Sequence, residues 1–334
     1  MENKKKIIEQ FELLIKQIQH DIKLLNEEDE NRNETFRIRA LTNVVNIIKK
    51  IPGEINSVDD LKGIKGIGDG TLRRVEEILE TGKLKEVHIT KEIEEYFLHS
   101  SELEEIFGIG KKKAYELIKK YDIKTVAELK KKYKSGEIEL PDNISKGLKY
   151  IGKIKENIPR ADIVEFEKKL QKIVLEISPN LLFIICGSYR RQKETSNDID
   201  IIIVNTNIKT KEQIENEKEN YLNLFVEKLK NRKIIIDSLT GENVKTKYMG
   251  ICKINNVMRR IDIRFIPYES YYPAILYFTG SKNLNKQMRQ IAISMNLTLN
   301  EYGLFDRKNN MIKVNSEKEI FDKLGMEFLT PDKR

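Results

Sequence analysis

The chain has 334 residues, of which 39% are hydrophobic, and a formal net charge of +8. This length predicts about two domains with real cores, the charge favours a polyanionic partner, and no apolar stretch is long enough to cross a membrane. We expect an intracellular, reducing compartment, because Met1–Ile7 is too charged for a secretory signal and two cysteines, Cys186 and Cys252, make no disulfide framework.

The first half of the chain reads as helical. Apolar positions at helical spacing predict a helix over about 4–26, followed by a charged loop through Glu34. A second helix is expected over 36–51, because Pro52 cannot continue it with a normal hydrogen bond.

Two related segments follow, and each reads as helix, Gly-Ile-Gly turn, helix. The turns are Gly66–Gly68 and Gly108–Gly110, and Lys111, Lys112 and Lys113 follow the second. Glycines let the backbone turn tightly and expose N–H groups, while the next helix presents its N-terminus to an anion. One such turn would fit an ordinary helix connection. Two predict helix-hairpin-helix motifs, which grip DNA phosphates without reading bases and whose binding weakens with salt.

The second half contains paired carboxylates. Asp198 and Asp200 precede four apolar residues, Ile201–Val204, which we expect to form a strand covered on both faces. Because residues i and i+2 of a strand project from the same face, the two aspartates are predicted to lie side by side. Such carboxylates repel each other unless a cation intervenes, and they suit Mg²⁺ where phosphates complete its shell. A solvated Asp-x-Asp at a strand edge is the plainer alternative.

The residues around this pair strengthen the metal interpretation. Gly187 and Ser188 can bring backbone N–H groups and a hydroxyl to a phosphate, which Arg191 can neutralise. Asp262 shares one face of an alternating strand with Arg260. Alone it would be a local ion pair, but beside the other two aspartates it would complete a two-metal site for in-line phosphoryl transfer.

Four long motifs occur in order: CGSYRRQKETSNDIDIIIV, RRIDIRFIP, YYPAILYFTGSKNLNKQMRQIA and EKEIFDKLGMEFLTPDKR. With this spacing the chain, from about Phe36 to its end, resembles the family X DNA polymerases, and among these the polymerase beta type. The resemblance implies an α+β fold, in which a helical N-terminal domain with helix-hairpin-helix motifs joins a nucleotidyltransferase palm with a mixed β-sheet. It implies four parts: a lyase-like DNA-binding domain (1–89), a duplex-binding subdomain (90–156), a catalytic palm (157–268) and a nucleotide-binding subdomain (269–334).

The resemblance also implies roles for individual residues. The catalytic residues and metal ligands are Asp198, Asp200 and Asp262, which hold two Mg²⁺ ions, with Mn²⁺ as a substitute. The implied nucleotide contacts are Gly187, Ser188, Arg191, Tyr277, Phe278, Gly280 and Asn285. The implied DNA contacts are Gly66, Gly68, Arg74, Gly108, Gly110, Lys111, Arg260, Lys286, Arg289 and Tyr302, with a monovalent cation at the helix-hairpin-helix turns. Core packing of Tyr277 and Phe278, and a solvated helix face for Lys286 and Arg289, are the plainer alternatives.

Several positions depart from the family pattern. Arg74 stands where the family's lyase domain has the lysine that forms a Schiff base with a 5′-deoxyribose phosphate. Arginine stays protonated and cannot serve as that nucleophile, so we expect weak or absent lyase activity. Leu41 replaces a tyrosine, Asn157 replaces an arginine that contacts the triphosphate, and Asn197 replaces a glycine.

The implied function is template-directed filling of short DNA gaps in base excision repair. The expected partners are gapped or nicked DNA, dNTPs and a repair ligase, with the chain acting as a monomer in the nucleus of a eukaryote or the cytoplasm of a bacterial or viral host. A template-independent nucleotidyltransferase stays open, although no insertion that would block the template path is apparent. A non-catalytic helix-hairpin-helix protein also stays open, although it would have no need of three carboxylates.

Overall fold

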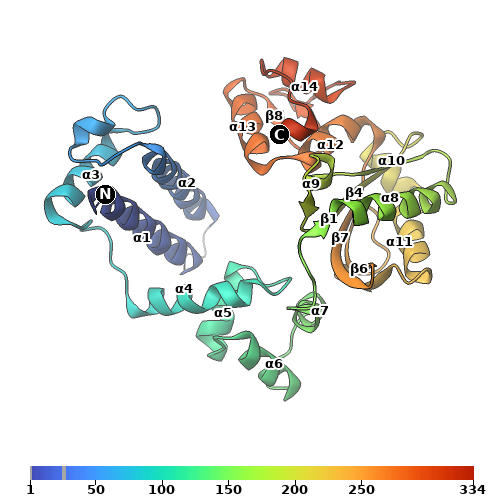
Figure 1. The fold of residues 1–334 in the computed structure, drawn as a ribbon, viewed down its shortest axis with the longest axis horizontal. Coiled ribbons are helices and arrows are strands. Elements are labelled where there is room, and N and C mark those ends of the chain that lie inside the picture. Colours follow the sequence, from blue (N-terminus) through green and yellow to red (C-terminus); the bar gives the residue numbers. More distant parts are fainter. Residues whose placement is uncertain (1, 25–27) are drawn as a thin grey trace. The chain divides into compact units, whose positions relative to one another are not determined.

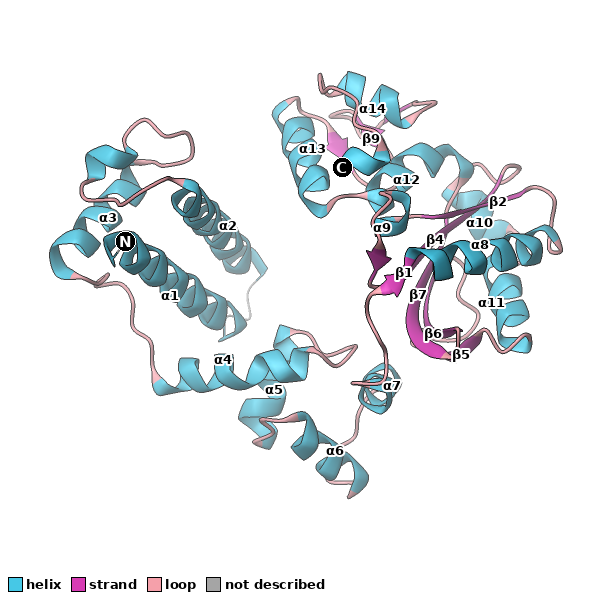
Figure 2. Cartoon of the chain, in the orientation of Figure 1, coloured by secondary structure: helices cyan, strands magenta, loops and turns pink. Residues whose placement is uncertain are grey.

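The computed structural model describes residues 2–24 and 28–334, which form two compact units, Met1–Leu140 and Pro141–Arg334 (Figure 1). The described part of the first unit is helical, and the strands of the described chain lie in the second unit (Figure 2). No helix within the described ranges is both long and apolar enough to span a membrane.

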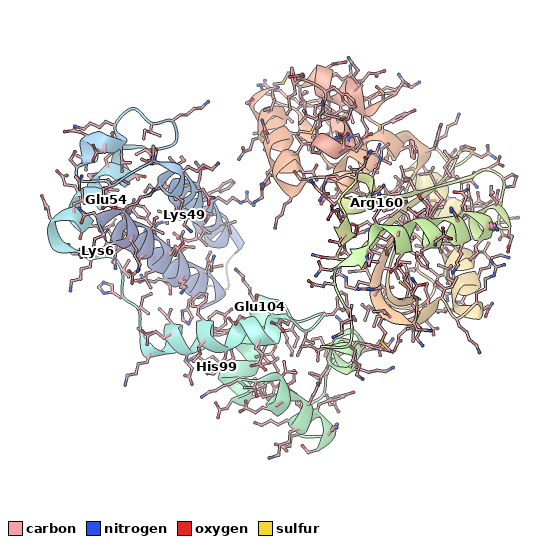
Figure 3. All side chains as sticks on the ribbon, viewed as in Figure 1. Lys6, Lys49, Glu54, His99, Glu104 and Arg160 are labelled. Carbon is pink, nitrogen blue, oxygen red and sulfur yellow. The ribbon has the colours of Figure 1, made fainter. Side chains whose placement is uncertain are left out.

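Seven helices build the described part of the first unit: α1 (Glu2–Leu24), α2 (Glu28–Lys50), the 3₁₀-helix η1 (Val58–Leu61), α3 (Asp69–Thr81), α4 (Lys91–Glu104), α5 (Lys111–Tyr121) and α6 (Val126–Lys134). The apolar faces of α1, α2 and α3 share one core, in which Phe11, Ile48 and Val75 are fully buried. Polar contacts add to this core: Lys49 on α2 pairs with Glu12 on α1 at 2.7 Å, and Glu54, in the loop after α2, accepts a hydrogen bond from the backbone of Asn3 on α1 at 3.0 Å (Figure 3).

The charged loop predicted through Glu34 is wrong for the residues that the structure describes. Helix α2 already begins at Glu28, and residues 25–27 lie outside the described residues. Glu and Arg are good helix formers, so a charged stretch can be helical. The predicted end of this helix is confirmed, since α2 stops at Lys50, shortly before Pro52.

Both predicted Gly-Ile-Gly turns lie directly before a helix. Gly66 and Gly108 have φ angles of +97° and +91°, and Gly68 and Gly110 are the N-cap residues of α3 and α5. Helix α4 precedes the second turn as predicted, but only the four-residue η1 precedes the first. The backbone turns soon after η1 because Gly63 takes a φ of +77°.

The second unit has many more elements. Its helices are α7 (Asp142–Tyr150), α8 (Arg160–Leu175), α9 (Gly187–Arg190), α10 (Lys211–Asn216), α11 (Tyr221–Asn231), η2 (Tyr268–Ser270), α12 (Tyr271–Thr279), α13 (Lys282–Ser294), α14 (Glu317–Lys323) and η3 (Pro331–Lys333). Its strands are β1 (Ile158–Pro159), β2 (Leu181–Ile185), β3 (Thr195–Ser196), β4 (Ile199–Asn205), β5 (Ile235–Ser238), β6 (Lys247–Ile254), β7 (Val257–Phe265), β8 (Thr298–Leu299), β9 (Leu304–Phe305) and β10 (Met311–Ile312).

The main sheet of this unit is mixed. Its five strands lie in the order β2-β4-β7-β6-β5, with β4 and β7 parallel and the other neighbours antiparallel. A helical first unit and a mixed sheet in the second unit together confirm the predicted α+β class.

The predicted burial of Ile201–Val204 on both faces of the sheet is confirmed. Ile201 and Ile203 share a core with α8 and α11, which lie along one side of the sheet (Figure 1). Ile202 and Val204 pack on the other face, in a core shared with α12. Because strand side chains alternate, Asp200 projects to the same face as Ile202, which is the face of α12.

Gly66→Ala is expected to destabilise the first unit by about 1–3 kcal/mol. An added Cβ at Gly66 would lie 2.7 Å from Ile47 Cδ1, in addition to the positive φ. Gly68→Ala is the matched control, because a Cβ there meets no atom within 4 Å. Urea unfolding followed by circular dichroism measures both variants, and equal loss of stability in the two would contradict this account.

Candidate active site

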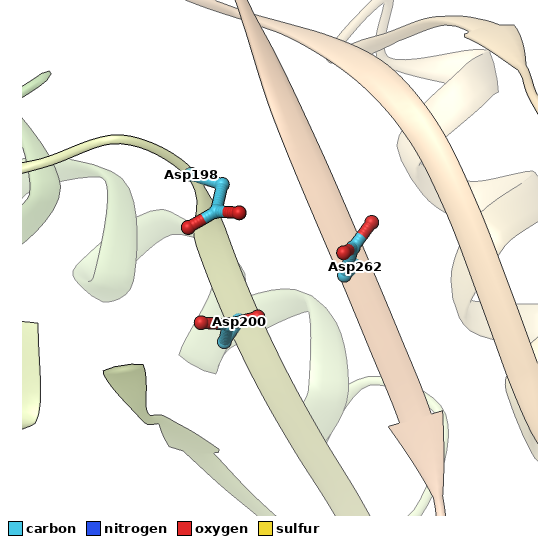
Figure 4. Close-up of side chains that lie close together, drawn as sticks. All are labelled: Asp198, Asp200 and Asp262. Atoms are coloured by element: carbon cyan, nitrogen blue, oxygen red, sulfur yellow. The ribbon is translucent and has the colours of Figure 1, made fainter. Parts of the chain in front are cut away.

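The register between two parallel strands brings the predicted carboxylates together. Asp200 on β4 lies directly opposite Asp262 on β7, and Asp198 immediately precedes β4. One carboxylate oxygen from each residue lies within 4.8 Å of the others (Figure 4). The structure therefore unites all three aspartates that the sequence singled out.

The negative charge of these three carboxylates is not fully balanced by the protein. Burial, followed by the charges of Asp198 and Asp262, raises the pKa of Asp200 to about 7. The pKa of Asp262 is also raised, first by burial. Oδ1 of Asp262 is buried without a hydrogen-bond partner among the described residues. Three partly buried carboxylates with an unsatisfied oxygen are a donor set suited to a divalent metal ion.

Arg260 supplies the positive charge nearest to the cluster. Its Nη2 donates to Oδ2 of Asp262 at 2.9 Å and to Oδ2 of Asp198 at 3.2 Å. Its own pKa is raised, because these two carboxylates outweigh the opposing effect of burial. Arg260, predicted as a DNA contact, therefore lies among the carboxylates and partly balances their charge.

The turn before this site requires glycine. Gly187 has a φ of +59°, and a Cβ there would lie 2.5 Å from Oδ2 of Asp200. The amide of Cys186 donates to the carbonyl of Asp200 at 2.8 Å, and Ser188 Oγ donates to Ser196 Oγ at 2.8 Å. The turn is thus held against β4, next to the aspartates.

The remaining predicted nucleotide contacts gather at the end of α12. Arg191 Nη1 donates to the carbonyl of Thr279 at 2.5 Å, one residue before Gly280. Asn285 on α13 donates to the carbonyl of Tyr277 at 2.7 Å. The guanidinium of Arg289 lies 4.9 Å from the centre of the Tyr277 ring. These contacts link the Gly187 turn, α12 and α13.

The predicted nucleotide contact Phe278 and the predicted DNA contacts Lys286 and Tyr302 belong to the same unit. The guanidinium of Arg264 is 5.5 Å from the centre of the Phe278 ring. Lys286 is exposed on α13, and Lys211 lies 5.5 Å from the ring of Tyr302. Gly66, Gly68, Arg74, Gly108, Gly110 and Lys111 belong to the first unit.

Arg74 is not a free cation in this structure. Its Nε donates to Oε1 of Glu86 at 2.5 Å, and Arg37 Nη2 donates to Oε2 of Glu86 at 2.9 Å. The hydrogen bond from Arg74 is the first cause of the lowered pKa of Glu86. One carboxylate therefore already occupies the space between two guanidinium groups.

Sequence reasoning did not find three charged residues that the structure connects to these sites. Glu86 pairs with Arg74, as above. Arg190 and Glu317 pair at 2.6 Å although they are 127 positions apart. Arg190 stands next to the recognised turn, which could have drawn attention to it, whereas Glu317 and Glu86 lie in ordinary charged stretches that give no local indication.

Three stretches of the chain match known families. Residues 157–268 match the DNA polymerase beta palm, residues 274–334 match the DNA polymerase beta thumb, and residues 3–84 match a helix-hairpin-helix domain.

Curated proteins are similar over most of the chain. DNA polymerase lambda of Arabidopsis thaliana is 31% identical over 310 residues, which cover 86% of this chain and 56% of that protein. DNA polymerase lambda of Rattus norvegicus is 26% identical over 321 residues, 91% of this chain and 53% of that protein. DNA nucleotidylexotransferase of Xenopus laevis is 27% identical over 342 residues, 91% of this chain and 64% of that protein. The chain thus spans 53% to 64% of the length of these relatives.

Asp200→Asn is expected to raise the melting temperature of the metal-free protein at about pH 8. The pKa of Asp200 is raised from 3.8 to about 7 in the folded state. Above pH 7 the group is ionised in both states and destabilises the fold fully. As the pH falls from about 7 towards 4, the folded state keeps the proton, so the advantage of the variant shrinks.

Differential scanning fluorimetry with and without a divalent cation tests this account. The cation should stabilise the unsubstituted protein more at about pH 8 than at about pH 5, because protons compete for the same oxygens. The variant should lose most of that stabilisation. A stabilisation by the cation that is the same at both pH values and in both proteins would contradict it.

Proposed function

Because the chain belongs to the family X DNA polymerases, we propose that it is a template-directed DNA polymerase that fills short gaps in base excision repair. The matches to the DNA polymerase beta palm and thumb confirm the family resemblance of the four sequence motifs. The observation that carries the proposal is the convergence of Asp198, Asp200 and Asp262 beside the Gly187–Ser188 turn. Such a carboxylate cluster next to a phosphate-sized turn suits phosphoryl transfer.

The three aspartates would hold two Mg²⁺ ions, for which Mn²⁺ can substitute. The fit rests on their convergent oxygens, the raised pKa values of Asp200 and Asp262, and the unpartnered Oδ1 of Asp262. When bound, such ions lower the pKa of a primer 3′-hydroxyl and neutralise the triphosphate and the leaving pyrophosphate.

The residues of the chain itself would bind and orient the substrates. Gly187 offers close backbone approach, Ser188 a hydroxyl and Arg191 a positive charge for the β- and γ-phosphates. Tyr277, Phe278 and Gly280 would lie against the incoming sugar. Asn285, held by the carbonyl of Tyr277, would contact the base.

DNA would be held mainly through its phosphates. We assign this role to the two Gly-Ile-Gly turns with Lys111, each turn with a monovalent cation, and to Arg260, Lys286, Arg289 and Tyr302 around the active site. The functional parts would be 1–89, 90–156, 157–268 and 269–334, with gapped DNA and dNTPs as substrates. Phosphate contacts of this kind position the duplex without reading its sequence.

A template-independent nucleotidyltransferase is the second candidate, favoured by the similarity to a DNA nucleotidylexotransferase. The two functions differ in one measurable property, which is whether the template base selects the added nucleotide.

Asp200→Asn and Asp262→Asn are each expected to lower primer extension on gapped DNA at least a thousandfold, since catalysis by metal-held phosphoryl transfer needs both ligands. DNA affinity should persist, because the helix-hairpin-helix turns belong to the other unit of the chain and keep their own residues. Extension assays with each dNTP singly, with and without a template strand, supply the measurement. Near-normal extension by either variant would remove the mechanism, and addition without template selection would favour the second candidate.

Borohydride trapping on an incised abasic site is expected to give little covalent adduct with the unsubstituted protein. Arg74 lacks a titratable amine, and Glu86 holds its guanidinium. The double variant Arg74→Lys/Glu86→Gln should gain an adduct, and Arg74→Lys alone should gain less, because Glu86 would keep the new ammonium protonated. A strong adduct from the unsubstituted protein would show that another amine, such as Lys62, Lys65 or Lys83, has taken this role.

A further inference from the structure

Three consecutive residues that follow the Gly187–Ser188 turn are each anchored to a different element. The hydroxyl of Tyr189 donates to Glu167 on α8 at 2.6 Å, and Arg191 donates to the carbonyl of Thr279 on α12 at 2.5 Å. Arg190, between them, reaches Glu317 on α14. The position of the turn therefore depends on side chains that lie outside the active site.

Glu317 is the centre of the third anchor. Arg190 donates to its two carboxylate oxygens at 3.0 and 2.6 Å. Arg334 Nη1 donates to Oε1 of the same carboxylate at 2.6 Å. The side chain of Glu317 is 9% exposed and that of Arg334 is 0% exposed. A buried carboxylate thus binds two guanidinium groups, and losing it would leave both without their ionic partner.

Each of the two arginines also makes contacts with residues other than Glu317. Arg190 Nη1 also donates to Oγ1 of Thr279 at 2.7 Å, which joins the network to the end of α12. Arg334 Nε donates to the carbonyl of Leu329 at 2.8 Å. Its guanidinium lies 5.4 and 5.7 Å from the ring centres of Phe321 and Phe328. The network therefore runs from the segment after α14 to both sides of the proposed nucleotide site.

We propose that Glu317 is a positioning residue for nucleotide addition: it fixes Arg190, and through Arg190 it sets the Gly187–Ser188 turn and Thr279 at the spacing that an incoming triphosphate needs. Arg334 supports this role by donating to Oε1 of the same Glu317 carboxylate. The inference rests on the proposed function for its substrate, but the coupling between Glu317 and the turn does not depend on catalysis.

A purely architectural pair would behave differently. It would lower stability when broken and leave the affinity of the folded protein for nucleotide unchanged. A positioning residue must alter the nucleotide site itself in the protein that remains folded, so nucleotide kinetics and local exchange at the turn separate the two roles.

Glu317→Gln removes the charge with little change of shape. We expect the KM for dNTP to rise about tenfold with a smaller change in kcat, the effect of about one charge-assisted hydrogen bond. Asp322→Asn is the matched control on the same helix, because the ionic partner of Asp322 among the described residues is the exposed Lys318, at 2.8 Å. Arg334→Lys should keep more nucleotide affinity than Arg334→Ala, because the lysine ammonium retains the positive charge beside Glu317. It should keep less than the unsubstituted protein, because the ammonium cannot reach both Glu317 and the carbonyl of Leu329.

Hydrogen–deuterium exchange gives a readout that needs no polymerase activity. The reporters are the amides of residues 190–193, which bond to carbonyls of residues 186–189. They should exchange faster in Glu317→Gln and not in Asp322→Asn. Asp237→Asn breaks the contacts of Asp237 with Lys149 and Tyr150, both at 2.8 Å, and controls for a general loss of stability.

The outcomes distinguish the inference from the proposed function. Unchanged exchange at 190–193 together with an unchanged KM would overturn the inference even in an active polymerase. Faster exchange at these amides in Asp237→Asn as in Glu317→Gln would also overturn it. Faster exchange in Glu317→Gln alone, in a protein that adds no nucleotide, would refute the proposed function and leave the coupling established.

Discussion

The fixed register of β4 against β7 is the constraint on which the active site depends. It sets Asp200 directly opposite Asp262. The two carboxylates therefore lie close together in a partly buried position, although they carry like charges. A pKa raised from 3.8 to about 7 corresponds to a cost on the order of 4 kcal/mol for the ionised form of Asp200. The four buried side chains Ile201–Val204 contribute roughly 1.5–3 kcal/mol each. Burial of the apolar side chains therefore outweighs the cost of burying the Asp200 carboxylate beside two like charges, and it keeps the carboxylates in place.

The rest of the site follows from that register. With Oδ2 of Asp200 occupying the space beside residue 187, only glycine fits there, and its absent side chain leaves the backbone next to the carboxylates. The same register gives Arg260, two residues before Asp262, access to both Asp262 and Asp198. A shift of β4 by one residue would turn the side chain of Asp200 towards the face of the sheet that α8 and α11 cover. The register of β4 against β7 therefore fixes both the geometry of the proposed catalytic site and the packing of the sheet.

Local patterns in the sequence were sufficient for features whose cause is local. Four consecutive apolar residues predicted the buried strand after Asp200, and alternation predicted the strand that carries Asp262. Patterns of this kind failed where charge was equated with a loop, since residues 28–34 belong to α2. They also gave no indication of Glu317. Its neighbour Glu319 makes a local contact with the backbone amide of Asn315 at 2.9 Å, whereas Glu317 binds Arg190, 127 positions away, and Arg334, 17 positions away. The different roles of these two glutamates follow from tertiary packing alone.

The two units differ in how their charged clusters are balanced, and this difference bears on which chemistry each can perform. In the second unit three carboxylates face one arginine, so negative charge remains to be balanced by a bound cation. In the first unit Glu86 lies between Arg37 and Arg74, so the positive charge that a DNA phosphate would need is already partly balanced within the fold. A guanidinium is also unable to act as an amine nucleophile, so the role that the proposed function gives the first unit is to bind DNA through its turns and lysines. The proposed phosphoryl transfer is therefore assigned to the carboxylate site of the second unit, where the charge is not fully balanced.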